Sequence, residues 1–309
     1  MHTNSQIYWR LFCVMSAAFL FTGCAYMEAK QGEWIFRPTN ATWRGSSDIP
    51  ANFVEHMIPV GKNGDTIHAW FSPAKNKDAP VLLYLHGARW NLTGSATRIP
   101  RWNKMGFSVL AIDYRGFGKS TLRAPTEALA NEDTEAAWAY LKTIAPAPDT
   151  RRFIFGHSLG GAMATKLAVN HPDASGLILE ATFTNIADMV KSSQYGFMPV
   201  STLITQRFDN LDRIDDVKIP ILISHGTADS IVPFAMSEKL FNAAKAKKVF
   251  FKAEGGNHHN LTSRYYDAYA DAVWTHFGLP PVVANAVSVA SATNATNATN
   301  PQPISNSAN

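Results

Sequence analysis

The residues of this sequence that could do chemistry together are a serine, an acid and a pair of histidines. The pentapeptide GHSLG at residues 156–160 has the form G-x-S-x-G, with Ser158 at its centre. Asp229 ends the segment HGTAD, and His258 and His259 are adjacent in EGGNHHNLT. A serine hydroxyl is a poor nucleophile unless an imidazole accepts its proton and a carboxylate orients that imidazole. These residue types predict nucleophilic catalysis if the fold brings them together.

The local context of Ser158 indicates a nucleophile. The apolar segment FIF at 153–155 runs directly into the pentapeptide, and a segment rich in alanine and leucine follows it. Strand, sharp turn and helix is the arrangement of a nucleophile elbow, in which the serine backbone is strained and nearby residues must be small. Gly156 and Gly160 meet that requirement, and the helix N-terminus favours developing negative charge. The pentapeptide alone would also fit a glycine-rich turn without chemistry.

Apolar segments that alternate with helical ones predict how these residues are positioned. Because the apolar segments lack polar alternation, we expect strands that are buried on both faces of a mostly parallel sheet, with helices on both faces. FVEHMIPV and TIHAWFSPA flank the turn-rich GKNGD and predict an antiparallel hairpin before the sheet. Residues 184–217 break the rhythm and predict a short insertion or cap. The predicted strands are VLLYLHG, FSVLAIDYRG, RRFIFGHS, SGLILEAT, PILISHGTAD and KKVFFKAEGG, and the predicted helices cover 127–144, 159–172 and 263–277.

Parallel strands bring their carboxyl ends to one edge of a sheet, which is where the acid and the base are expected. Asp229 follows the strand PILISHGTAD, and the next strand, KKVFFKAEGG, leads to the two histidines. Glu180 ends the preceding strand and is the alternative acid, or otherwise a structural partner under the insertion. These positions at the strand ends predict Ser158, Asp229 and one histidine as the reacting residues, and the strands alone do not decide between His258 and His259.

In combination, the motifs LYLHG, DYRGFGKS, GHSLGG, HGTADSIVP and EGGNHHN resemble those of the α/β-hydrolase family. The resemblance covers roughly residues 53–279 and is strongest to the acyl-hydrolase branch related to serine aminopeptidases, lysophospholipases and protein depalmitoylases. That branch commonly ends its last loop as E-G-x-x-H-N-D, which implies His258 as the base and leaves His259 as the alternative. The family's H-G-x after the first parallel strand implies the backbone N–H of Ala88 as an oxyanion donor beside that of Leu159.

The residues and the resemblance together imply a serine hydrolase of carboxylic esters or thioesters that acts through an acyl-enzyme. A serine peptidase of the aminopeptidase type and a lipid-anchored binding module without catalysis are the alternatives. No cofactor is implied, and the remaining histidines lack the spacing of metal ligands. Trp90, Phe183, Phe197 and Met198 could line an acyl pocket, but they could equally pack in the core or in a lid.

Composition supports a globular body. The chain has 309 residues, of which 46% are hydrophobic, and a formal net charge of +4. The basic residues are scattered, so nucleic acid is not expected as a main partner. A monomer is expected. Cys13 and Cys24 are the only cysteines, which excludes a disulfide framework or a thiolate metal site in the body that follows them.

The N-terminus carries a targeting pattern. Arg10 precedes the apolar run LFCVMSAAFLF, and the following TGC completes a sequence that resembles a bacterial lipobox. That resemblance implies a signal peptide over 1–23, a lipidated Cys24, and an anchor and linker over 24–52. The expected location is the bacterial cell envelope, at the outer membrane facing the periplasm, with membrane attachment through Cys24. Secretion and an uncleaved signal anchor are the alternatives.

The C-terminal segment differs in composition from the rest of the chain. Residues 280–309 contain no charged side chain and repeat the triplet NAT. Such an uncharged, low-complexity sequence is typical of a disordered tail, which is therefore expected here.

Overall fold

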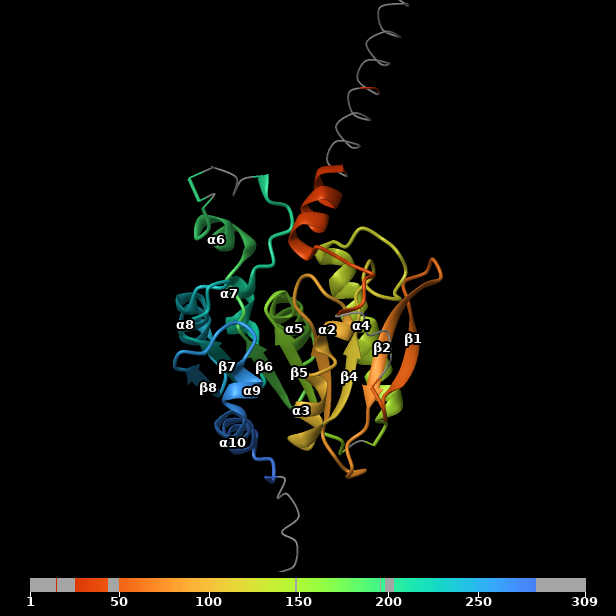
Figure 1. The fold of residues 1–309 in the computed structure, drawn as a ribbon, viewed down its shortest axis with the longest axis vertical. Coiled ribbons are helices and arrows are strands. Elements are labelled where there is room, and N and C mark those ends of the chain that lie inside the picture. The colour runs from red at the N-terminus through yellow and green to blue at the C-terminus, as the bar shows by residue number, and fades with distance from the viewer. Residues whose placement is uncertain are drawn as a thin grey trace, which may run out of the picture.

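An eight-stranded sheet forms the centre of the structure, a computed structural model that describes residue 15 and residues 26–43, 50–147, 149–194, 196–197 and 203–281 (Figure 1). The strand order is β1-β2-β4-β3-β5-β6-β7-β8. The strands are β1 (Val54–Val60), β2 (Asp65–Ser72), β3 (Val81–Leu85), β4 (Ser108–Ile112), β5 (Arg152–His157), β6 (Gly176–Glu180), β7 (Ile221–Gly226) and β8 (Lys248–Ala253).

The strand directions confirm the predicted mostly parallel sheet. β1 and β2 form the predicted antiparallel hairpin, and β2 pairs antiparallel with β4. All the other neighbouring strands pair in parallel. Every residue of β3, β4, β6 and β7 is buried, as expected for strands that have helices on both faces. The carboxyl ends of the parallel strands therefore share one edge of the sheet.

Helices cover both faces and divide the core into two parts. α4, α5 and α8 pack with strand residues such as Leu83 and Ile154 on one face. α2, α3 and α10 pack with Tyr84 and Phe155 on the other face, because successive strand residues point to opposite sides. The bounds of these helices are Leu92–Ser95 for α2, Ile99–Lys104 for α3, Glu127–Ile144 for α4, Leu159–Asn170 for α5, Phe234–Ala243 for α8 and Tyr266–Phe277 for α10.

Two predicted segments have more internal structure than the sequence indicated. The closing helix is split into α9 (Leu261–Arg264) and α10, with Tyr265 between them at non-helical backbone angles. The predicted insertion at 184–217 contains α6 (Ile186–Lys191), α7 (Asn210–Arg213) and the short 3-10 helix η3 (Ile214–Asp216).

Residues 26–36 form a helix that packs on the domain, so the expectation of a linker over 24–52 is wrong for this part (Figure 1). Phe36 at its end is fully buried and belongs to the core on the α4 side of the sheet. Gly32, one turn earlier, approaches the backbone so closely that a Cβ there would lie 1.9 Å from the carbonyl oxygen of Pro125. Gln31 also donates a hydrogen bond to the Leu203 carbonyl at 2.8 Å, which ties the helix to the insertion.

Several expectations fall on residues outside the described part of the chain. They are Cys24, the signal peptide apart from Met15, and the tail from residue 282 onward. Within the part of the chain that the structure describes, no helix is both long and apolar enough to cross a lipid bilayer.

Candidate active site

Ser158 lies in the sharp turn between β5 and α5, at the carboxyl edge of the sheet. Its backbone angles are φ 54° and ψ −120°, a strained conformation for a residue other than glycine. The turn is fixed by neighbours: the Ser158 N–H donates to the Glu180 carbonyl at 2.9 Å, and the Thr182 hydroxyl donates to the Ser158 carbonyl at 2.8 Å. The strained backbone and the helix that follows are those of the predicted nucleophile elbow.

The glycines beside Ser158 are required by close packing. A Cβ on Gly156 would lie 2.4 Å from the Gly160 carbonyl oxygen, and a Cβ on Gly160 would lie 2.2 Å from the Leu85 carbonyl oxygen. Real Cβ atoms do not approach backbone atoms so closely, so side chains at these positions would force β5, α5 and β3 apart. The absence of side chains lets α5 start directly beneath the serine.

Asp229 and His258 meet at the same edge of the sheet. His258 Nδ1 lies 2.7 Å from Asp229 Oδ2, and the other carboxylate oxygen accepts backbone N–H bonds from Ile231 and Val232 at 2.8 and 2.9 Å. Both side chains of the pair are buried. The carboxylate can only accept, so Nδ1 of His258 carries the proton and Nε2 is left unprotonated to act as a base.

His225 also contacts the acid, which the sequence analysis did not predict. Its Nε2 lies 3.0 Å from Asp229 Oδ2 and 3.0 Å from the Val232 carbonyl oxygen, so this nitrogen carries a proton. Burial alone would raise the pKa of Asp229, but the hydrogen bonds from His225 and His258 hold it well below its ordinary value. The carboxylate is therefore charged. The signal for His225 was its place four residues before the acid at the end of a buried strand.

The two adjacent histidines have different surroundings. His258 is 4% exposed and contacts the acid, whereas His259 is exposed and forms no hydrogen bond to Asp229. Burial, and then the charges of His258 and Arg98, lower the pKa of His259 to about 4. His259 is therefore a neutral neighbour of the base at ordinary pH.

His157 joins the elbow to the histidine loop. Its Nε2 donates to the His258 carbonyl at 2.9 Å, which fixes the backbone of the base beside the residue before the nucleophile. The Ser158 hydroxyl itself forms no hydrogen bond to another described residue. Catalytic hydrogen bonds of this kind are often long before substrate binds and shorten in the complex. The structure thus brings Asp229 and His258 into contact, and the bond from His157 holds the His258 backbone beside the residue that precedes Ser158.

The predicted oxyanion donors, the backbone N–H groups of Ala88 and Leu159, belong to residues that line the same cavity as Ser158. Among the described residues, neither the N–H of Ala88 nor that of Leu159 has a hydrogen-bond acceptor. The loop that carries Ala88 continues through Arg89 and Trp90 with φ values of 65° and 23°. Its backbone is held by the Arg89 N–H, which donates to the Phe36 carbonyl at 2.7 Å. The helix at 26–36 therefore helps to position this loop.

The alternative acid, Glu180, has a structural role. It is completely buried and forms an ion pair with Arg98, which lies in the turn before α3. Among the described residues, no hydrogen bond or ion pair joins Glu180 to His258. Arg115 also has a structural role, because its Nε donates to Asp133 at 2.6 Å while other guanidinium nitrogens reach Asp65 and Glu132.

Two cavities open beside the elbow. The smaller has a volume of about 280 Å³ and is lined by Ser158 and Leu159 together with apolar side chains, among them Phe183, Ile186, Met189 and Val190. We call it the acyl cavity. Trp34 and Ile35 of the N-terminal helix form part of its wall. Of the residues suggested for such a pocket, Phe183 is present, Phe197 is 83% exposed and lines neither cavity, and Met198 lies outside the described residues.

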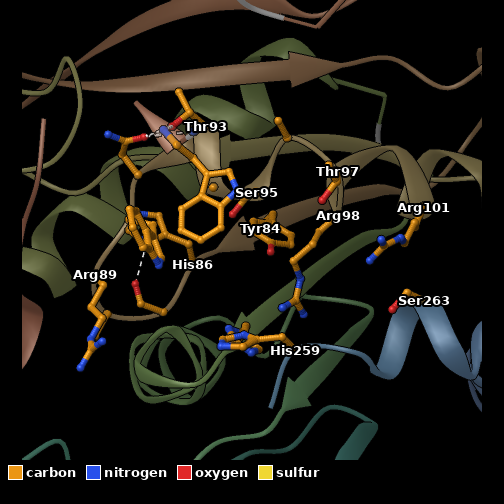
Figure 2. A pocket seen from close by; sticks show the side chains of 18 residues that line it. Tyr84, His86, Arg89, Thr93, Ser95, Thr97, Arg98, Arg101, His259 and Ser263 are labelled. Carbon is orange, nitrogen blue, oxygen red and sulfur yellow. Dashed lines mark hydrogen bonds between the residues drawn. The ribbon is translucent and has the colours of Figure 1, made fainter. Parts of the chain in front are cut away.

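The larger cavity has a volume of about 540 Å³ and contains Trp90, the remaining suggested residue (Figure 2). We call it the arginine cavity, because Arg89, Arg98 and Arg101 line it together with His157 and His259. Ala88 is the one residue that lines both cavities.

A metal ion could also be held near the site. His157, His258 and His259 each offer a ring nitrogen, and these atoms lie within 4.8 Å of one another. Binding there would compete with the hydrogen-bonding roles of His157 and His258 described above.

Comparison with known proteins decides the family. A family model described as serine aminopeptidase, S33, matches residues 76–211. An uncharacterized protein of Mycobacterium tuberculosis is 31% identical over 216 residues, which cover 70% of this chain and 75% of that protein. The chain belongs to the α/β-hydrolase family. Membership supports a hydrolytic function and confirms the resemblance drawn from the motifs.

Further relatives of this α/β hydrolase include enzymes. The lysophosphatidylserine lipase ABHD12 of Xenopus tropicalis is 31% identical over 194 residues, which cover 57% of this chain and 49% of that protein. A solved structure of an esterase from Pyrococcus furiosus superposes with a TM-score of 0.63 at 16% identity, covering 78% of this chain and 98% of that one. At that identity the likeness shows the fold alone.

Proposed function

We propose that this chain is a serine hydrolase that cleaves carboxylic esters or thioesters of an apolar acyl group. The observation that carries the proposal is that Ser158 lines an apolar cavity beside the hydrogen-bonded pair of Asp229 and His258. A hydrolase that forms an acyl-enzyme needs both features, because the acyl group must be held where the serine attacks. The lipase among the relatives acts on an acyl ester according to its name, which agrees with this proposal.

In the proposed reaction, Ser158 Oγ attacks the acyl carbon while His258 Nε2 accepts its proton. Asp229 keeps the ring in the required tautomer and stabilises the imidazolium. The N–H groups of Ala88 and Leu159 donate to the oxyanion. His258 then gives the proton to the departing alcohol or thiol, and water hydrolyses the acyl-enzyme with the same base.

A serine peptidase of the aminopeptidase type is the second candidate, because the matching family model carries that description. An aminopeptidase must hold the cationic amine of its substrate, which calls for a carboxylate in the pocket. The described residues that line the two cavities include no aspartate or glutamate. The linings therefore favour an ester or thioester over a peptide, and the presence of all three reacting side chains argues against a binding module.

Active-site labelling and substrate series test this proposal. Wild-type protein is expected to react with a fluorophosphonate and to hydrolyse p-nitrophenyl esters, with amino-acid p-nitroanilides cleaved much more slowly. Ser158→Ala is the matched control and should lose labelling and turnover while its melting temperature shows that it is folded. A folded wild type that neither labels nor hydrolyses any ester would refute the proposal.

We also propose that Cys24 carries a lipid and holds the enzyme at a membrane of the bacterial envelope, where lipid acyl esters are at hand. The proposal rests on the lipobox-like sequence and on the helix at 26–36, whose Trp34 and Ile35 line the acyl cavity. An anchor two residues before this helix would keep the cavity close to the bilayer. Incorporation of a labelled fatty acid that is lost in Cys24→Ser would support it, and equal incorporation in both would refute it.

A further inference from the structure

We propose that the arginine cavity binds the alcohol half of the substrate and that this alcohol carries an anionic group, a phosphate or a carboxylate. The inference rests on the proposed ester hydrolysis at Ser158. It adds a binding site for the leaving group, formed mainly by Arg98 and Arg101.

The positions of the reacting groups decide which cavity takes which half of the ester. The departing alcohol must lie near His258, because this residue returns the proton to it. The two histidines whose rings flank His258, His157 and His259, have ring centroids 4.8 Å from it and line the arginine cavity. Ser158 and Leu159 line the acyl cavity instead. An ester bound with its carbonyl at Ala88, between the cavities, therefore has its acyl chain in one and its alcohol in the other.

Gly87 keeps the passage from the serine to the arginine cavity open. A Cβ at this position would lie 3.0 Å from the Ser158 Cβ and 3.3 Å from His157 Nδ1. Since Gly87 itself lines the arginine cavity, the missing side chain leaves space for the atoms that join the acyl carbon to the alcohol.

Arg98 provides a buried donor that its protein partner does not fully satisfy. The residue is 8% exposed, and one terminal nitrogen pairs with Glu180. Its Nε is buried and has no hydrogen-bond partner among the described residues. Figure 2 shows the guanidinium of Arg98 pointing into the cavity toward His259. The Nε atom is occluded from the cavity, so an anion bound there would accept hydrogen bonds from the terminal nitrogens of Arg98.

Arg101 adds a positive charge that no carboxylate neutralises. Its side chain forms no ion pair with a described residue, and its one hydrogen bond to a described residue is a long one of 3.4 Å to the Thr262 hydroxyl. In Figure 2 its guanidinium lies near Arg98 and Ser263, whereas Arg89 points away from them. The pair Arg98–Glu180 is neutral as a whole, so Arg101 leaves this end of the cavity with an excess of positive charge.

The positive charge of Arg98 also lowers the pKa values of neighbouring groups. Burial and then the charge of Arg98 lower the pKa of Arg101. The same two causes, in the same order, hold the pKa of His157 well below its ordinary value, and the Arg98 charge also contributes to the lowered pKa of His259. A bound anion would relieve this repulsion. Planar guanidinium groups match phosphate and carboxylate oxygens with paired hydrogen bonds, which a neutral alcohol cannot use equally.

Kinetics with three esters of one acyl chain test the inference in the full chain. The substrates are 1-dodecanoyl-glycerol 3-phosphate, 3-dodecanoyl-glycerate and neutral 1-dodecanoyl-glycerol. Wild type is expected to show a higher kcat/KM for at least one anionic ester than for the neutral one. Arg101→Gln should lower this preference by about tenfold or more, the range for a lost charge-assisted hydrogen bond. Arg101→Lys, which keeps the charge but not the fork, should fall between them.

Lys104→Gln is the matched control, because Lys104 is an exposed cation of the same helix that does not line the cavity. It should leave the preference unchanged. The larger loss in Arg101→Gln, for the phosphate or for the carboxylate ester, identifies the anion. Equal kcat/KM for all three esters in wild type, or an equal effect of the Lys104 and Arg101 substitutions, would overturn the inference.

A binding measurement separates this inference from the proposed reaction. Glycerol 3-phosphate and glycerate are titrated calorimetrically into Ser158→Ala, with glycerol as the neutral probe. At least one of the two anions should bind more tightly than glycerol, and adding Arg101→Gln should weaken that binding by about tenfold or more. Selective anion binding by Ser158→Ala, together with a wild type that hydrolyses no ester, would count against the reaction alone. Ester hydrolysis without selective anion binding would count against the anion site alone.

Discussion

Replacing Asp229 by asparagine is expected to inactivate the site by moving the proton of His258 to the wrong nitrogen. Asp229 Oδ2 receives hydrogen bonds from His258 at 2.7 Å and from His225 at 3.0 Å, while Oδ1 receives two backbone N–H bonds. An amide has one accepting oxygen. With that oxygen in the Oδ1 position, its NH₂ faces both rings, and His258 Nδ1 must give up its proton. The proton then sits on Nε2, which can no longer accept one from Ser158.

The size of the effect follows from these contacts. The opposite orientation, with the amide oxygen facing His258, would leave the backbone N–H groups of Ile231 and Val232 facing an NH₂ group. Each unsatisfied buried donor costs about 1–3 kcal/mol. The wrong-tautomer orientation is therefore favoured. Loss of the correct tautomer lowers kcat by about 10⁴-fold where the same Ser-His-Asp arrangement has been changed in this way. At about 1.4 kcal/mol for each tenfold change, that is about 5 kcal/mol of transition-state stabilisation.

Steady-state hydrolysis of an activated ester and the rate of fluorophosphonate labelling should both fall in Asp229→Asn, while thermal melting checks that the protein is folded. Glu180→Gln is the matched control, since Glu180 is the other strand-end carboxylate and pairs with Arg98 instead. Its melting temperature should fall and its labelling rate should change far less. A folded Asp229→Asn that retains more than about one tenth of wild-type kcat would refute the tautomer argument, given the expected 10⁴-fold loss.

Further predictions concern three variants at neighbouring positions. His259→Gln should retain far more activity than His258→Gln in the same ester assay. Because the pKa of His259 is lowered from 6.5 to about 4, the unfolded chain binds more protons than the folded chain between these pH values, and stability falls as the pH drops through this range. The fall in melting temperature from pH 7 to pH 5 should therefore be smaller in His259→Gln than in wild type. Gly161→Ala should lower the melting temperature, since the new Cβ would lie 2.4 Å from Thr182 Oγ1, an overpacking that costs about 1–3 kcal/mol. Met189→Trp should fill part of the acyl cavity and shift the preferred chain length of p-nitrophenyl esters downward.

Much of the fold could be predicted because the central strands are apolar on both faces. That pattern predicted a mostly parallel sheet. The helical spacing also predicted the bounds of α4, Glu127–Ile144. The elbow at Ser158 could also be predicted, since its glycines are required by backbone contacts that any such turn must make. These features depend on the period of hydrophobic residues and on local sterics, which the sequence shows directly.

Features that depend on a few long-range contacts could not be predicted. The helix at 26–36 buries little more than Gly32 and Phe36, so its hydrophobic pattern is too short to stand out. His225 contacts the acid through the fold of the loop after β7, and its place four residues before the acid does not by itself show which way the ring points. Arg98 lies more than 80 residues from its partner Glu180, and nothing in either local sequence indicates the pair. The packing of the N-terminal helix and the contacts of His225 and Arg98 can be recognised only when the tertiary structure is known.

The two cavities have only Ala88 in common among the described residues that line them, and this separation affects how specificity can change. Substitutions at distant positions without shared partners usually have additive effects on free energy. A change in the wall beside Met189 and a change beside Arg101 should therefore combine by simple addition. The two walls could then be varied in separate libraries and the best members joined afterwards, so that the screening effort is the sum of two searches instead of their product. Natural variation among relatives could follow the same course, with each half of the site drifting at its own rate.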